Sequence, residues 1–142
     1  MAICYLMGAF VKRTPRILIA DRNPHVRALL KREMTKEGWH VLLAKSSHDI
    51  VRQMFHKETV DILILDSELP GRESSSVMRM LEKQYPFLDV VKHVADAKES
   101  RWPNPGKKTY VVEKSGNSVE TLKRVVKRFI LKTGYKSCNG DP

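Results

Sequence analysis

Two aspartates stand at the ends of apolar runs in this chain. Asp21 follows residues 17–20 (Ile-Leu-Ile-Ala), and Asp66 follows residues 62–65 (Ile-Leu-Ile-Leu). Such runs between polar neighbours are typical of strands buried on both faces of a parallel sheet. Functional side chains in these sheets gather just beyond the carboxyl ends of the strands. If the two runs are neighbouring strands, their carboxylates lie close enough to hold a hard cation or to receive a phosphoryl group.

The rest of the sequence predicts strands and helices in strict alternation. Apolar residues at helical spacing follow the strands, and capping or turn residues separate the elements. We expect strands near residues 17–20, 41–44, 62–65, 88–94 and 110–112. We expect helices that begin after Asn23, at Ser46 or Ser47, before Val77 and after Asn117. This alternation predicts an α/β fold with a doubly wound parallel sheet and right-handed crossovers.

Length and cysteine content indicate one domain in a reducing compartment. The chain has 142 residues, and its two cysteines, Cys4 and Cys138, lack metal-ligand spacing. This argues against a disulfide scaffold or a zinc site. The apolar residues 1–11 are far short of the roughly 20 that a membrane span needs, and they lack signal-peptide features. Either the start codon is placed too early and Met7 is the true first residue, or these residues form a short helix or strand that packs on the domain. We expect a cytoplasmic protein without a membrane partner.

The charge is strongly basic, with a formal net charge of +10 and a pI of about 9.8. Lysines and arginines gather in residues 123–136, on the polar side of the last expected helix. Such a helix permits binding to nucleic acid or to acidic protein surfaces, but it also fits a solvated helix face. The sequence shows no nucleophile elbow, glycine-rich phosphate loop or paired acid/base signature, so we do not expect an enzyme.

The order of these motifs resembles the receiver domain of two-component response regulators, of the chemotaxis-regulator type. The resemblance covers residues 16–131 and rests on three features. These are Asp21 followed by Pro24, Asp66 followed by Leu-Pro-Gly at 69–71, and Lys114 after the last strand. It implies a five-stranded flavodoxin-like sheet in the order 2-1-3-4-5. It also implies a receiver domain at 16–132, between an N-terminal extension (1–15) and a C-terminal tail (133–142).

The resemblance also implies a role for each residue of the pocket. Asp66 would accept a phosphoryl group from a histidine kinase or phosphotransfer protein, and Asp21 would supply the acidic pocket. Mg²⁺ would be held by Asp21, Asp66 and the backbone carbonyl of Glu68. Lys114 would contact phosphoryl oxygens. These residue types suit a carboxylate nucleophile, a bridging cation and a group that neutralises transferred charge.

Three departures from the family pattern affect this pocket. Arg22 stands where a second acidic residue is usual, so it either pairs with Asp66 in place of the cation or points elsewhere on the surface. Ala95 stands at the position that usually carries a hydroxyl. Two prolines and a glycine within residues 97–108 predict a shortened or irregular fourth helix. We therefore expect weak magnesium binding and weak or absent labelling by a small phosphodonor.

Three functional hypotheses follow. The first is a stand-alone receiver in a phosphorelay, with Asp66 as the phosphoacceptor and a downstream protein target that the sequence does not identify. The second is a pseudo-receiver that binds its partner independently of phosphorylation. The third is a nucleic-acid-binding protein that uses the basic last helix; charge alone favours it, and no helix-turn-helix or other DNA-binding motif accompanies it.

Overall fold

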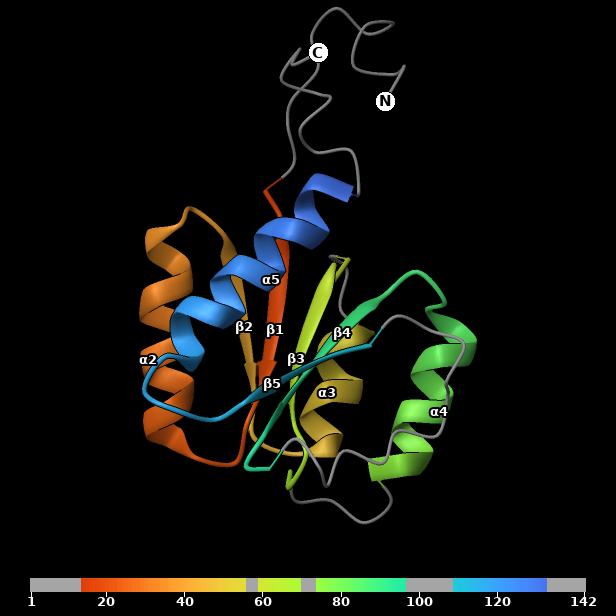
Figure 1. Ribbon diagram of the computed structural model, residues 1–142. Helices are drawn as coiled ribbons and strands as arrows, with labels where there is room; N and C mark the ends of the chain where they lie inside the picture. Colours follow the sequence, from red (N-terminus) through yellow and green to blue (C-terminus); the bar gives the residue numbers. More distant parts are fainter. Residues whose placement is uncertain (1–13, 56–58, 70–73, 97–108, 133–142) are drawn as a thin grey trace, which may run out of the picture.

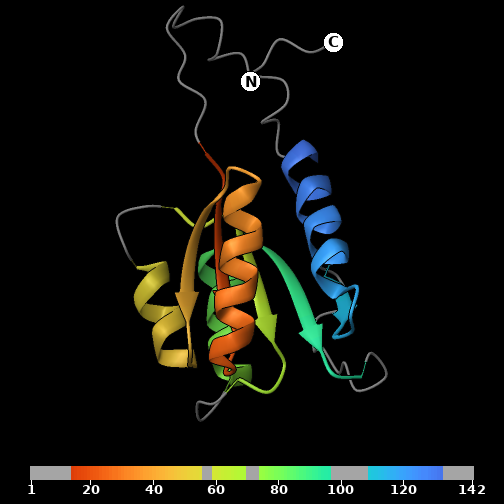
Figure 2. The ribbon, with the colours of Figure 1, turned by 90° about the vertical axis from the view of Figure 1, so that its left-hand side faces the viewer.

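The computed structural model, which describes residues 14–55, 59–69, 74–96 and 109–132, contains one parallel sheet. Its strand order is β2-β1-β3-β4-β5, and Figure 2 shows the arrowheads at one end of the sheet. The strands are β1 (Arg16–Ala20), β2 (His40–Ala44), β3 (Ile62–Asp66), β4 (Asp89–Val94) and β5 (Thr109–Glu113). The helices are α2 (Pro24–Lys36), α3 (Ser47–Met54), α4 (Ser74–Gln84) and α5 (Ser118–Lys132). The predicted strand order is confirmed, and helices alternate with strands everywhere except between β4 and β5, where residues 97–108 are not described.

Helices cover both faces of the sheet, with α2 and α5 on one side and α3 and α4 on the other (Figure 1). Successive residues of β1 and β3 point to opposite faces of the sheet, and helices cover both faces. This is why the apolar runs 17–20 and 62–65 contain no polar residue. The core beneath α2 and α5 includes Ile17, Ile19, Leu30, Met34, Ile62, Ile64, Leu122, Val126 and Phe129. The core beneath α3 and α4 includes Leu18, Ile50, Leu63, Leu65, Met78 and Leu81.

The helix α2 begins after Asn23, as the sequence predicts, and ends at Lys36, two residues before Gly38. The Asn23 side chain accepts a hydrogen bond from the His25 amide at 2.8 Å, and Pro24 occupies the first turn. Asparagine caps the free amides at a helix start, and proline fits there because its missing donor is not needed. Gly38 has a φ of 87°, the left-handed conformation that closes many helices. The turn positions β2 next to β1.

Replacing Gly38 with alanine should lower the free energy of unfolding by about 1 kcal/mol, because a side chain is strained at positive φ. A Cβ atom at this position would meet no atom within 4 Å, so the effect reports backbone conformation and not a clash. Gly116→Ala is the matched control, because Gly116 has equal space and no positive φ. Urea unfolding followed by circular dichroism measures both variants, and equal stabilities would contradict the prediction.

Several predictions concern residues outside those described. The irregular fourth helix falls on residues 97–108, so it stays a prediction. The division into extension, receiver and tail also stays a prediction, because residues 1–13 and 133–142 are not described. Within the described part of the chain, no helix combines the length and apolar character needed to cross a membrane.

Candidate functional site

The structure brings Asp21, Asp66 and Lys114 together at the carboxyl edge of the sheet. Asp66 ends β3, and Asp21 directly follows the neighbouring strand β1. The Lys114 Nζ atom lies 3.1 Å from Asp66 Oδ1 and 3.4 Å from Asp21 Oδ2. The backbone amide of Lys114 donates to the carbonyl of Val94 at 2.7 Å, which places its side chain at this edge. One ammonium group therefore bridges the two carboxylates.

Backbone amides complete the coordination of both aspartates. Asp21 Oδ1 accepts a hydrogen bond from the Asn23 amide at 2.8 Å. Asp66 Oδ2 accepts from the Arg22 amide at 3.2 Å, and its Oδ1 accepts from the Glu68 amide at 3.1 Å. The two aspartates are only 1% and 2% exposed, respectively. Their protein partners therefore replace most of the water that would otherwise solvate them.

The two carboxyl groups differ in acidity. Burial raises the pKa of Asp21; the amide of Asn23 opposes this effect, while the charge of Asp66 adds to it. Burial alone would also raise the pKa of Asp66. Hydrogen bonds from the Glu68 amide, Lys114 and the Arg22 amide outweigh it and hold the pKa of Asp66 below its usual value. Asp66 is thus an anion at neutral pH, as a carboxylate nucleophile must be.

The sequence left two positions open for Arg22, paired with Asp66 or pointing elsewhere on the surface, and the structure shows an intermediate arrangement. Its main side-chain partner is Glu68, which accepts a hydrogen bond from Nη2. Its Nε atom is 3.9 Å from Asp66 Oδ2, a long ion pair, and the side chain is 51% exposed. The backbone-carbonyl role that the resemblance implies for Glu68 stays a prediction. Its described contacts are those of its amide with Asp66 and of its carboxylate with Arg22.

The described residues do not fit a magnesium site. Mg²⁺ requires nearly octahedral oxygen ligands and retains several waters. Of the predicted ligands, Asp21 and Asp66 share the ammonium of Lys114, and the Glu68 carboxylate is paired with Arg22. No group of three acidic, histidine or cysteine side chains suited to a metal ion occurs in the part of the chain that the structure describes. The ammonium of Lys114 and the guanidinium of Arg22 therefore lie beside the oxygens that a divalent ion would need.

No hydroxyl group is found at the described end of β4. Ala95, which the resemblance aligns with the usual hydroxyl position, is exposed. Val94 before it is buried and equally unable to donate a hydrogen bond. Whichever of these two residues is placed at that position, its side chain offers no donor to a phosphoryl oxygen.

The sequence did not single out His93, which lies on β4 opposite Asp66 in the strand register. His93 is only 3% exposed, and neither ring nitrogen has a hydrogen-bond partner among the described residues. Burial, followed by the charge of Lys114, lowers the pKa of His93 to about 4, and the charge of Asp66 opposes them. In the sequence, His93 lies within a valine-rich run that predicts a buried strand. That pattern indicates burial of His93 but not which side chains lie next to it.

The sequence also did not indicate the role of Arg27. Its Nη1 atom donates to the carbonyl oxygens of Asp21 at 2.7 Å and Arg22 at 3.1 Å. The loop after β1 is therefore held by a side chain from the first turns of α2. This contact limits the positions that the Arg22 backbone can take.

The basic last helix uses part of its charge within the molecule. Lys123 lies 3.2 Å from Glu33 on α2, and Lys127 lies 3.5 Å from Glu37. The guanidinium of Arg128 lies 5.9 Å from the ring centroid of Tyr110. These contacts attach α5 to α2 and β5. They account for three of the basic residues without a nucleic-acid partner.

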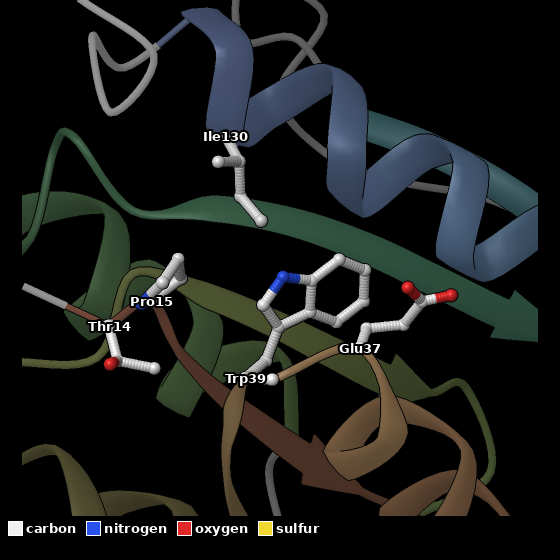
Figure 3. Close-up of a pocket in the computed structure, with 6 residues that line it drawn as sticks. Thr14, Pro15, Glu37, Trp39 and Ile130 are labelled. Atoms are coloured by element: carbon white, nitrogen blue, oxygen red, sulfur yellow. The ribbon is translucent and has the colours of Figure 1, made fainter. Parts of the chain in front are cut away.

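A separate cavity of about 220 Å³ lies at the opposite edge of the sheet. Figure 3 shows Ile130 pointing from α5 toward Trp39, which precedes β2. The described residues that line it are Thr14, Pro15, Glu37, Gly38, Trp39 and Ile130. Its single lining carboxylate, Glu37, already pairs with α5. The cavity therefore does not compete with the aspartate pair as the candidate site.

Comparisons with known proteins agree with this geometry. The response regulator receiver domain family model matches residues 17–102. TrrA of Thermotoga maritima, a response regulator crystallised with Mg²⁺ and BeF, is 29% identical with a TM-score of 0.71; the match covers 82% of this chain and 99% of that one. A complex of TrrA with the histidine kinase ThkA gives 27% identity, a TM-score of 0.71 and the same coverage.

A curated relative extends the comparison to a larger protein. The DNA-binding transcriptional regulator NtrC of Proteus hauseri is 25% identical over 75 residues. The match covers 53% of this chain and only 16% of the relative, so it concerns a small part of that regulator. With the family model matching more than half of the sequence and the aspartates placed at the sheet edge, the chain belongs to the response regulator receiver domain family.

Proposed function

We propose that this receiver domain works in a phosphorelay and that Asp66 is its phosphoacceptor. The observation that carries the proposal is the position of Lys114, whose ammonium lies 3.1 Å from one oxygen of the buried Asp66 carboxylate. A cation at this place favours the ionised nucleophile and stays beside the oxygens of the transferred group. The proposed role is that of a phosphoacceptor and not of an enzyme.

The proposed donor is a phosphohistidine on a histidine kinase or a phosphotransfer protein. An oxygen of Asp66 forms a bond to phosphorus, the bond from phosphorus to the histidine nitrogen breaks, and the imidazole leaves with the electron pair. The ThkA–TrrA complex supports a kinase as partner, because the match to TrrA covers 82% of this chain. The contacts of the described residues do not suggest which protein is the downstream target.

Intact-mass measurement tests the phosphoacceptor. We expect slow addition of one phosphoryl group when the wild type is incubated with acetyl phosphate, and none for Asp66→Asn. Asp96→Asn is the matched control, because it removes another aspartate close to the same edge of the sheet. Equal labelling of wild type and Asp66→Asn would contradict the assignment of Asp66.

A phosphorylation-independent pseudo-receiver is the second candidate. The coordination of Asp66 favours it, since both carboxylate oxygens already accept hydrogen bonds from the protein. The lack of a hydroxyl at Val94 and Ala95 favours it too. Absence of labelling from both acetyl phosphate and a phosphorylated kinase, in a folded protein, would establish this second reading over the first.

A further inference from the structure

Arg22 is held beside the acceptor by contacts at both ends. Its backbone amide donates to Asp66 Oδ2 at 3.2 Å, and its Nε atom lies 3.9 Å from the same oxygen. The far end of its guanidinium is bound by Glu68. Because the Glu68 amide also donates to Asp66, the loops after β1 and β3 hold the arginine and the acceptor as one unit. Such anchoring limits the orientations of a long side chain.

Cations therefore flank the acceptor on both of its oxygens. Lys114 approaches Asp66 Oδ1, and Arg22 approaches Oδ2. The Lys114 side chain is 25% exposed, whereas that of Arg22 is 51% exposed. Arg22 is thus the cation on the side that an incoming phosphodonor can reach. A guanidinium carries five N–H donors in one plane, so donors that Glu68 does not use can pair with phosphoryl oxygens.

We propose that Arg22 takes the part of the divalent cation, so that Asp66 is phosphorylated without a metal. This inference rests on the proposed function. With acetyl phosphate, an Asp66 oxygen forms the new bond to phosphorus, and the bond between phosphorus and the acetate oxygen breaks. Acetate leaves with the electron pair. Arg22 and Lys114 neutralise the phosphoryl oxygens during transfer and in the product, and Glu68 positions the guanidinium.

The test compares labelling in excess EDTA with labelling in millimolar Mg²⁺, again by intact mass. For the wild type we expect the same rate in both buffers. Arg22→Gln should be slower by about 100-fold in both, because it removes the charge without supplying a metal ligand. Arg22→Asp supplies a carboxylate next to Asp21, so its labelling should depend on Mg²⁺. Arg32→Asp is the control, since it makes the same charge change at an exposed arginine paired with Glu33.

The outcomes separate this inference from the function on which it rests. A wild type that is labelled in Mg²⁺ but not in EDTA would overturn the role of Arg22 and leave Asp66 as the acceptor. A wild type labelled by acetyl phosphate in neither buffer would overturn the inference, and absence of labelling from a phosphorylated kinase as well would contradict the proposed function itself. Calorimetric titration of the wild type with Mg²⁺ provides a second measurement that needs no variant to fold. We expect no binding, and a site occupied at millimolar Mg²⁺ would overturn the inference.

Discussion

Replacing Lys114 with methionine should lower the free energy of unfolding at pH 7 by about 2–3 kcal/mol. The lysine is the one cation within 3.5 Å of both Asp21 and Asp66 among the described residues. Without it, two carboxylates that are almost fully buried repel each other with no cation between them, although backbone amides still donate to both. The loss should be below that of a fully buried pair, because the Lys114 side chain retains some contact with water.

The effect of Lys114→Met should depend on pH in a defined direction. Removing the cation raises the pKa of both carboxyl groups in the folded state. A folded protein with raised carboxyl pKa values binds more protons than the unfolded chain, so its relative stability improves as the pH falls. The difference between variant and wild type should therefore shrink between pH 7 and pH 4.5. Urea unfolding at several pH values measures it.

Two further variants make this prediction specific. Lys127→Met removes an exposed lysine that pairs with Glu37, and it should change the stability by less than about 1 kcal/mol. Adding Asp21→Asn to Lys114→Met removes the repulsion between the carboxylates, so it should restore most of the lost stability. If the double variant is no more stable than Lys114→Met alone, the loss comes from packing of the lysine stem and not from the carboxylate pair.

The sequence predicted the scaffold because the scaffold depends on patterns that repeat. Alternating apolar strands and amphipathic helices determined the layers, and the ends of the two apolar runs located Asp21 and Asp66. Lys114 could be placed only through the family resemblance, since nothing in its local sequence links it to residues far away in the chain. The strand order was likewise taken from the resemblance, and the structure confirms it.

The partner of Arg22 could not be predicted from the sequence. An arginine after Asp21 has several acidic side chains within reach, and the choice among them depends on the paths of two loops. Hydrogen bonds from Arg27 to the first loop and from the Glu68 amide to Asp66 determine those paths. Such contacts join residues without any regular spacing, so no periodic pattern reveals them.

Replacing His93 with leucine should stabilise the protein by about 1–2 kcal/mol at pH 7. Both ring nitrogens are buried without a hydrogen-bond partner among the described residues, and each such atom loses its interaction with water on folding. Leucine is of similar size and carries no polar atom, so it removes this loss without a large cavity. The prediction is contradicted if His93→Leu is less stable than the wild type, which would mean that the imidazole is satisfied in solution.

The pH dependence of this variant separates a charge effect from a packing effect. Burial lowers the pKa of His93 from 6.5 to about 4 in the folded protein. Above pH 6.5 both states hold a neutral imidazole. As the pH falls toward 4 the unfolded chain binds the proton first, so the wild type should lose up to about 3 kcal/mol in this window. His93→Leu should lack that loss, whereas His25→Leu, at an exposed histidine, should keep it. Parallel curves for wild type and His93→Leu would show that His93 takes up its proton equally readily in both states, and that water or a moving Asp66 reaches the ring.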